Sequence, residues 1–255
     1  MTTITIVTIT YHAARCLQRT LDSVARQTYP HIQHLIIDGQ STDGTVEMAR
    51  KYQADSPHAV TVQSEPDKGL YDAMNKGLQQ ATGDYIVFLN AGDSLYADDT
   101  IATVARCAEK GAPAVIYGDT AITDAEGRFL RMRRHRPPEQ LTWRSFKRGM
   151  LVCHQAFYVR LDIAREYPYN LRYRHSADVD WCIRVMKEAD CRKLPLVNCH
   201  ATVANFEEGG DTKQNHRESL RERYHVMAQH YGQVQTFLLH CWFVVRALAG
   251  KGGTE

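Results

Sequence analysis

Two short apolar runs, each followed by a turn that contains acidic residues and glycine, constrain the fold of this chain most strongly. Residues 35–37 lead into the turn 38–45, and residues 85–89 lead into the turn 90–93. Short β-branched runs of this kind are typical of buried parallel strands whose carboxyl ends carry polar loops. In open α/β sheets, ligands bind at those ends. The two turns therefore mark the expected binding edge of a sheet.

Strand-like and helix-like segments alternate through the first half of the chain. This alternation predicts an α/β fold with a doubly wound, mainly parallel sheet and helices on both faces. Strands are expected at residues 4–10, 32–38, 60–62, 85–89 and 115–117, and helices at residues 17–30, 44–52, 70–83 and 100–110. The second half is expected to contain a hairpin over 120–132, a strand over 154–160, a helix over 178–189 and a helical segment over 215–249 that is interrupted near Gly232.

Charge and cysteine content exclude several classes of function. The chain has 31 Lys and Arg residues against 29 Asp and Glu residues, so its net charge of +2 does not favour nucleic-acid binding. Its seven cysteines include no Cys-x-x-Cys pair, which predicts reduced thiols in the cytoplasm and no zinc site. The first residues show no basic segment ahead of an apolar one, so no secretory signal is expected.

Three acids follow three successive predicted strands. Asp38, Asp67 and Asp93 each lie at a strand mouth, so we expect them to converge on one crevice. A carboxylate there could accept a base N–H or a ribose hydroxyl, and Asp93 could instead bind a divalent cation that neutralises a diphosphate. The alternative for Asp38 and Asp43 is a role as helix N-caps and turn formers.

Four ordered motifs resemble those of the family 2 glycosyltransferases with the GT-A fold. They occupy residues 8–11, 38–45, 64–77 and 83–93. The resemblance covers residues 1–210 and is greatest to the branch that builds bacterial surface polysaccharides, colanic-acid type enzymes included. It implies a Rossmann-like GT-A domain over 1–210, with a nucleotide-sugar-binding half (1–118) and an acceptor half (119–210). Residues 211–255 would be a C-terminal helical extension.

The resemblance also implies roles for single residues of the first half. The donor nucleotide would be bound by Thr8, Tyr11, Asp38, Asp67, Lys68, Asn90 and Ala91. The turn 90–93 occupies the place of the Asp-x-Asp metal motif, but Asn90 and Gly92 stand where acids are common. Asp93 is therefore the expected ligand of Mg²⁺ or Mn²⁺.

The second half would supply the catalytic base and the acceptor site. An inverting transfer needs a carboxylate that removes the acceptor proton, and the resemblance places it at Asp178. Asp180 is the alternative, about 200° further around the same helix, and simple N-capping is the other reading of Asp178. The resemblance puts His154 and Gln155 near the acceptor or a phosphate. Gly209 and Gly210 would belong to a loop over the diphosphate.

Two further segments leave alternatives open. Five arginines between Arg128 and Arg136 form either a solvated hairpin edge or a contact for anionic lipid or a lipid-linked diphosphate. The apolar tail 236–249 is too short to span a bilayer. It could lie on the inner face of the plasma membrane, pack against the core, or form a homodimer contact.

Together these features predict an inverting, metal-dependent hexosyltransferase. It would move a sugar from a nucleoside-diphosphate donor, UDP-linked above all, to a hydroxyl of a lipid-linked or oligosaccharide acceptor. The alternatives are a non-catalytic nucleotide-sugar binding or assembly protein, and a sugar nucleotidyltransferase. The latter would need a glycine-rich, basic loop that residues 11–15 do not provide.

Overall fold

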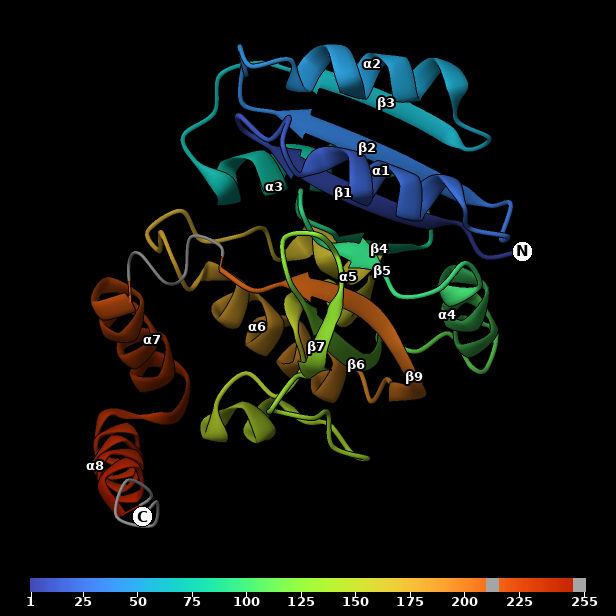
Figure 1. Ribbon diagram of the computed structural model, residues 1–255. Helices are drawn as coiled ribbons and strands as arrows, with labels where there is room; N and C mark the ends of the chain where they lie inside the picture. Colours follow the sequence, from blue (N-terminus) through green and yellow to red (C-terminus); the bar gives the residue numbers. More distant parts are fainter. Residues whose placement is uncertain (210–215, 250–255) are drawn as a thin grey trace.

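The structure is a computed structural model that describes residues 1–209 and 216–249. Four parallel strands form the first half of its sheet (Figure 1). In order across the sheet they are β3 (Ala59–Ser64), β2 (Ile32–Asp38), β1 (Ile4–Thr10) and β4 (Tyr85–Phe88). Every residue of β1 is buried, because both faces of the sheet are covered. The parallel sheet predicted for this half is confirmed.

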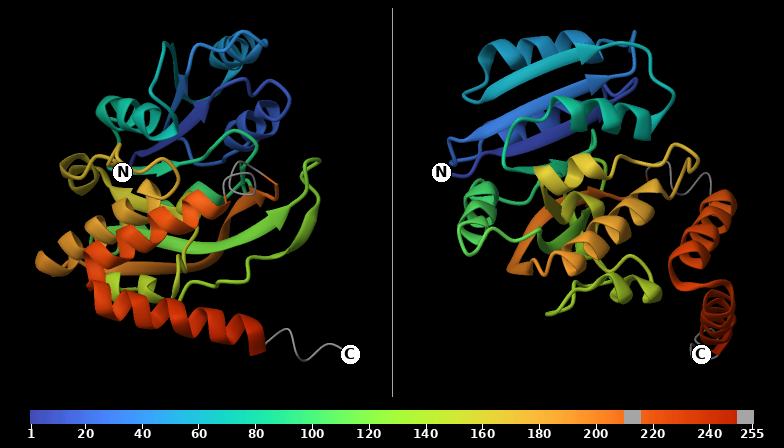
Figure 2. Two further views of the ribbon diagram at one scale, coloured as in Figure 1. Left: turned by 90° about the vertical axis from the view of Figure 1, so that its left-hand side faces the viewer. Right: turned by 180° about the vertical axis from the view of Figure 1, so that it is seen from behind.

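Helices cover both faces of these strands, because successive side chains of each strand point to opposite faces and are apolar on both. Ile36 packs with Leu21 on one face, whereas Ile37 lies beside Gly77 on the other. The first face is covered by α1 (Leu17–Ala25) and α2 (Thr45–Asp55), and the second by α3 (Leu70–Gln80) (Figures 1 and 2). A Cβ at Gly77 would lie 2.4 Å from the Val7 side chain, so the glycine lets α3 approach the sheet closely.

The second half of the sheet is mixed, with antiparallel strands beside parallel ones. Beyond β4 come β8 (Phe157–Arg160), β6 (Val115–Thr123), β9 (Leu196–Glu207) and β5 (Ser94–Leu95), while β7 (Phe129–Met132) pairs with β6 as a hairpin. β8 is antiparallel to both β4 and β6, whereas β6 and β9 run parallel. β9 was not predicted. The expected strand over 154–160 begins with a 3₁₀ turn, η2 (His154–Ala156).

Aromatic side chains pack the second half around α6 (Ala177–Cys191). Trp181 is fully buried between the rings of Phe88 and Tyr169, at centroid distances of 5.8 and 4.9 Å. These contacts fix the first turns of α6 against the end of β4. The remaining short elements are α4 (Thr100–Ala108), η1 (Trp143–Arg148) and α5 (Leu161–Glu166).

The C-terminal segment forms two helices that break where expected. Gly232, with φ of +89°, separates α7 (His216–Tyr231) from α8 (Gln233–Ala249). α7 packs against α6, and its Val226 belongs to the main core. α8 lies along the outside of the molecule (Figure 2, left). None of the described helices combines the length and the apolar character that crossing a membrane requires.

Candidate functional site

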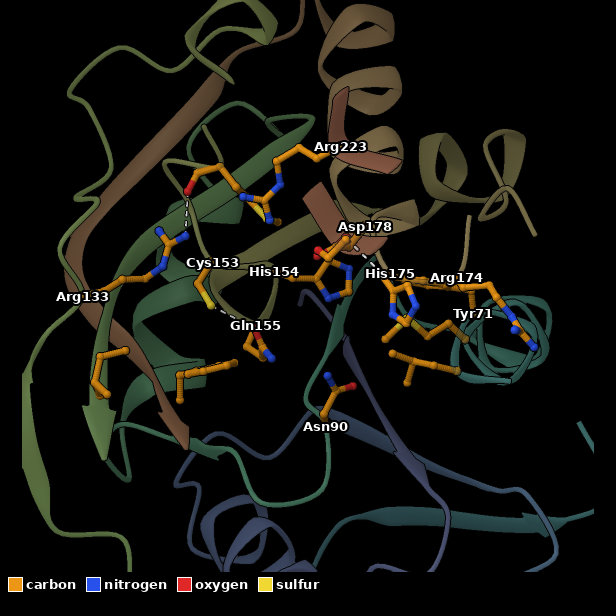
Figure 3. A pocket seen from close by; sticks show the side chains of 16 residues that line it. Tyr71, Asn90, Arg133, Cys153, His154, Gln155, Arg174, His175, Asp178 and Arg223 are labelled. Carbon is orange, nitrogen blue, oxygen red and sulfur yellow. Dashed lines mark hydrogen bonds between the residues drawn. The ribbon is translucent and has the colours of Figure 1, made fainter. Parts of the chain in front are cut away.

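A cavity of about 280 Å³ opens where the end of β4 meets the beginning of α6 (Figure 3). Its walls come from α3, the turn after β4, η2, the beginning of α6, and α7. Among its lining residues are Tyr71, Asn90, Arg133, His154, Gln155, Arg174, His175, Asp178, Ser219 and Arg223. The cavity therefore brings together side chains that are far apart in the sequence.

Asp178 is the carboxylate of this cavity. It lies in the first turn of α6, where the helix dipole favours a negative charge. The Tyr71 hydroxyl donates a hydrogen bond of 3.1 Å to its Oδ1. Burial, followed by the charge of Asp178, raises the pKa of Tyr71 well above its usual value, so Tyr71 remains a donor. The carboxylate is thus held by one oxygen while the other can accept a further proton donor.

Asp180, the alternative base, points away from the cavity. It is 1% exposed and accepts hydrogen bonds of 2.7 Å from both Arg184 Nε and His230 Nε2. Burial opposes its ionisation, but the His230 and Arg184 interactions outweigh burial and lower its pKa. Asp180 therefore ties α6 to α7.

Glu222 of α7 fixes the backbone that leads into α6. Its carboxylate accepts hydrogen bonds from the backbone N–H groups of Arg174, His175 and Ser176, at 2.8, 2.7 and 3.1 Å. Ser176, the N-cap residue, makes no side-chain cap of its own and instead donates through Oγ to the Ser219 carbonyl. The position of Asp178 thus depends on a helix distant in sequence.

His154 and Gln155 both line the cavity, but neighbouring side chains already engage them. His154 is 5% exposed, and its Nε2 lies 2.7 Å from the Tyr169 hydroxyl. Burial lowers its pKa despite the nearby charge of Asp178, so the ring is neutral at pH 7. Gln155 donates from Nε2 to Asp93 Oδ2 at 2.6 Å.

Asp93 is buried behind this wall rather than exposed in the cavity. Besides the contact with Gln155, its Oδ1 accepts the backbone N–H of Glu207 at 2.9 Å. Desolvation raises its pKa to about 7, although these two hydrogen bonds act in the opposite direction. Asp93 thereby joins the turn after β4 to η2 and to the end of β9. Of the turn residues, Asn90 lines the cavity, and its buried Oδ1 has no hydrogen-bond partner.

The residues expected to bind the nucleotide divide into two groups. Tyr11, which is 67% exposed, and Asp67 both lie against Gly39 at the carboxyl edge of β1 and β2, so they are accessible to a ligand. Thr8 is fully buried and bonds His34 at 2.9 Å, which makes its side chain unavailable. A role of Thr8 in nucleotide binding stays a prediction.

Asp38 has the turn-forming role that was its alternative. Its two oxygens accept hydrogen bonds from Thr10, Ser64 and both the backbone and the side chain of Ser41. Burial acts against ionisation, but the hydrogen bonds from Ser41, Ser64 and Thr10 together lower the pKa of Asp38. At 1% exposure it stabilises the loop, and none of Asp38, Asp67 and Asp93 lines the cavity, so their meeting in one crevice stays a prediction.

The remaining predicted site residues lie outside the cavity wall. Lys68 is exposed, and its backbone N–H bonds Asp72, while Ala91 is half-buried beside the small core cluster under α1. Gly209 follows β9 with φ of +122°, and Gly210 lies outside the described residues.

The arginine-rich hairpin is largely paired with acids. Arg128, Arg131 and Arg136 form ion pairs with Asp124, Glu208 and Asp119, respectively. Of the hairpin arginines, Arg133 lines the cavity, where it donates to the carbonyl oxygens of Met150 and Leu151. The paired arginines fit the solvated-edge interpretation.

Comparison with known proteins identifies the family. Residues 5–167 match the model of "Glycosyl transferase family 2". The chain belongs to this family. A PGL/p-HBAD biosynthesis glycosyltransferase of Mycobacterium bovis is 35% identical over 207 residues, which are 80% of this chain and 77% of the relative. The putative teichuronic acid biosynthesis glycosyltransferase TuaG of Bacillus subtilis is 33% identical over 95 residues, 37% of this chain and 38% of that one.

Solved structures confirm the GT-A fold of this family 2 glycosyltransferase. Staphylococcus aureus TarS 1–349 in complex with UDP-GlcNAc aligns with a TM-score of 0.70 at 14% identity, over 97% of this chain and 73% of that one. The mannosyltransferase PcManGT of Pyrobaculum calidifontis, in complex with GDP-Man and Mn²⁺, aligns with a TM-score of 0.65 at 15% identity, over 98% and 79% of the two chains.

The side chains of this glycosyltransferase do not form a metal site at the turn 90–93. Both oxygens of Asp93 are used internally, and the described residues contain no group of three His, Cys, Asp or Glu side chains that could hold an ion. A Cβ at Gly92 would lie 2.9 Å from Glu207 Oε2, and Glu207 is itself paired with Arg19. Asn90 Oδ1 is the hard oxygen of the turn that lacks a partner. The donor set therefore does not fit the expected role of Asp93.

Tyr71, Glu222 and Arg223 take part in the site although the sequence did not single them out as functional residues. Tyr71 lies within the resembling segment 64–77, so its place near the site could have been found there. Glu222 and Arg223 lie beyond the family-matched residues 5–167. Their sequence signal is no more than the polar character of two neighbouring positions in a helix rich in charged residues.

Proposed function

We propose that this family 2 glycosyltransferase moves a hexose, with inversion, from a nucleoside-diphosphate donor to an acceptor hydroxyl, and that Asp178 is the general base. The observation that supports this most directly is the placement of Asp178 in the cavity wall, bonded by Tyr71 through one oxygen. Asp178 would take the hydroxyl proton as the acceptor oxygen attacks the anomeric carbon opposite the departing diphosphate. The reaction needs no covalent intermediate on the protein.

The donor would enter from the carboxyl edge of β1, β2 and β4. Tyr11 and Asp67 are accessible there and can contact the base and ribose. Asn90 Oδ1, which is unpaired in the cavity, can accept a hydroxyl of the ribose or of the donor sugar. UDP is the first nucleotide to test, with GDP second, because TarS was solved with UDP-GlcNAc and PcManGT with GDP-Man.

The acceptor would be lipid-linked or an oligosaccharide of the bacterial surface. The names of the mycobacterial and Bacillus relatives, in PGL/p-HBAD and teichuronic acid biosynthesis, support this class. An apolar stripe on α8 would hold the enzyme at a membrane, as Val234, Phe237 and Leu238 are 75%, 59% and 61% exposed. Sedimentation with anionic vesicles should decrease in Phe237→Ser. A stripe that instead forms a homodimer would leave sedimentation unchanged and make Phe237→Ser monomeric.

Nucleotide binding and turnover of Asp178→Asn test the catalytic proposal together. We expect the variant to bind UDP or GDP as the unsubstituted enzyme does. Its release of nucleotide from the sugar donor should fall by about 10²–10⁴, the usual contribution of a general base. Tyr71→Phe is the matched partner variant and should lose much less. If the unsubstituted protein binds nucleotide but turns over no donor with any acceptor, a non-catalytic binding protein would be the better description.

A further inference from the structure

We propose that Arg223 binds an anionic group, as a phosphate ester presents, on the acceptor. This deepens the function proposed above and rests on it, because it uses Asp178 to separate the donor side of the cavity from the acceptor side. The proposal assigns a binding role to α7, which lies beyond the family-matched residues 5–167.

The fold directs Arg223 toward the cavity. Ser219, Arg223, Val226 and His230 recur at three- and four-residue steps and so share one face of α7. Val226 is fully buried, Ser219 accepts a hydrogen bond from Ser176, and His230 bonds Asp180. Its neighbours on that face are anchored to α6, and Arg223 itself lines the cavity.

The guanidinium of Arg223 has an unfilled donor. Its Nε is buried and has no hydrogen-bond partner, although a buried N–H of a charged group is costly to leave unpaired. Arg133, which lines the same cavity, already donates to the Met150 and Leu151 carbonyl oxygens. A ligand oxygen at Arg223 would supply the missing acceptor, and a phosphate or carboxylate oxygen does so with charge assistance.

The place of Arg223 indicates the acceptor rather than the donor. Figure 3 shows Asp178 and His154 between Asn90 on one side and Arg223 on the other. Asn90 follows the end of β4, where the nucleotide sugar would enter, so Arg223 lies beyond the proposed base. An acceptor hydroxyl must reach the base from that far side. An anionic group next to the hydroxyl would then lie against Arg223.

The charge of the lining agrees with an anionic acceptor. Arg133, Arg174 and Arg223 contribute three permanent positive charges, whereas Asp178 is the single carboxylate among the lining residues that the structure describes. The donor diphosphate can offset part of this excess from its own side, and an anionic acceptor group at Arg223 would offset the rest.

Phenyl phosphate is a suitable probe, with benzoate as the carboxylate arm, measured by isothermal titration in the presence of saturating UDP or GDP. We expect Arg223→Gln to weaken binding of at least one of these anions by about tenfold or more, as loss of a charged hydrogen bond does. Arg221→Gln is the matched control, because Arg221 is an exposed arginine of the same helix outside the cavity lining. This control should bind the anions as the unsubstituted protein does.

Three results would overturn the assignment. Arg223→Gln could bind both anions unchanged, or the nucleotide-loaded enzyme could bind neither. In the third, the substitution would weaken the binding of UDP more than that of UMP and leave the binding of phenyl phosphate and benzoate unchanged. That result would place Arg223 at the donor diphosphate. Failure of the unsubstituted protein to bind any nucleotide would instead contradict the proposed function, so the two failures are distinguishable.

Discussion

Glu222→Ala should reduce turnover through a residue that does not contact the substrate. The carboxylate of Glu222 accepts three consecutive backbone N–H groups just before α6, at 2.7 to 3.1 Å. Alanine would remove both acceptor oxygens and with them all three hydrogen bonds. The segment 174–176 would then lose the contacts that determine where Asp178 enters the cavity, while Asp178 itself would be unchanged.

The expected magnitude follows from the exposure of the three donors. Arg174 is exposed and His175 is half-buried, so water can replace the carboxylate at their N–H groups, whereas Ser176 is fully buried. An unpaired buried N–H costs about 1–3 kcal/mol, and loss of a helix cap costs about 1 kcal/mol. We therefore expect the free energy of unfolding to fall by about 2–4 kcal/mol. A displacement of Asp178 of about 1 Å could lower kcat by up to about a hundredfold.

Urea unfolding and steady-state kinetics of nucleotide release measure the two effects separately. Glu218→Ala is the matched control, because Glu218 lies on the same helix with a 71% exposed side chain and makes a 3.5 Å pair with His175. Such a surface pair contributes about 0–1 kcal/mol, so this variant should be near normal in both assays. If Glu222→Ala lost the expected stability but kept its kcat under conditions where it is fully folded, the positioning argument would be refuted.

Three further predictions concern the turn after β4 and the base. The pKa of the Asp93 carboxyl is about 7 in the folded state, against 3.8 for an unperturbed group. Between pH 4 and 7 the unfolded state therefore binds fewer protons than the folded state, so the free energy of unfolding falls as the pH rises through this range. Asp93→Asn should remove this pH dependence, which is measured by comparing the urea unfolding midpoints at pH 5 and pH 8. The same variant should leave any Mn²⁺ dependence of turnover unchanged. Gly92→Asp should lower stability by about 1–3 kcal/mol without creating Mn²⁺ affinity by calorimetry, because the residue has φ of +97° and faces Glu207. Tyr71→Phe should lower kcat for nucleotide release by less than about tenfold, since the Asp178 carboxylate loses one hydrogen bond but keeps its place in the cavity wall.

The sequence was sufficient to predict the first half of the fold, because there the residue pattern of each segment favours the same conformation that its place in the sheet requires. Residues 32–38 contain three isoleucines and a leucine, are bounded by turn residues, and form β2 with the predicted bounds. β9 shows the opposite case. It runs from Leu196 to Glu207 with His200 in the left-handed region and mostly half-buried positions, so it has neither a continuous apolar run nor a regular alternation. Its strand conformation depends on pairing with β6, which no local pattern reveals.

The candidate site shows the same limit at the level of single carboxylates. Asp38, Asp93 and Asp178 all follow the pattern of an acid at the end of a strand or the beginning of a helix. In the structure only Asp178 of these three lines the cavity, whereas Asp38 accepts four hydrogen bonds from its own surroundings and each oxygen of the buried Asp93 accepts one. The donors to Asp93 come from η2 and β9, far along the chain. Sequence spacing can place a carboxylate at the binding edge, but it cannot show how many of its lone pairs remain for a ligand.

α7 explains why the second half of the site was the harder part to predict. A base at the beginning of a helix needs its backbone fixed, and the usual solution is a side-chain cap from the N-cap residue itself. Here Ser176 donates to α7 instead, and Glu222 of α7 accepts the neighbouring N–H groups. The position of Asp178 therefore depends on contacts with α7, the helix from which Arg223 reaches the cavity. A displacement of α7 would therefore alter the base and the proposed acceptor contact together, so catalysis in this enzyme should depend on residues beyond the family-matched domain.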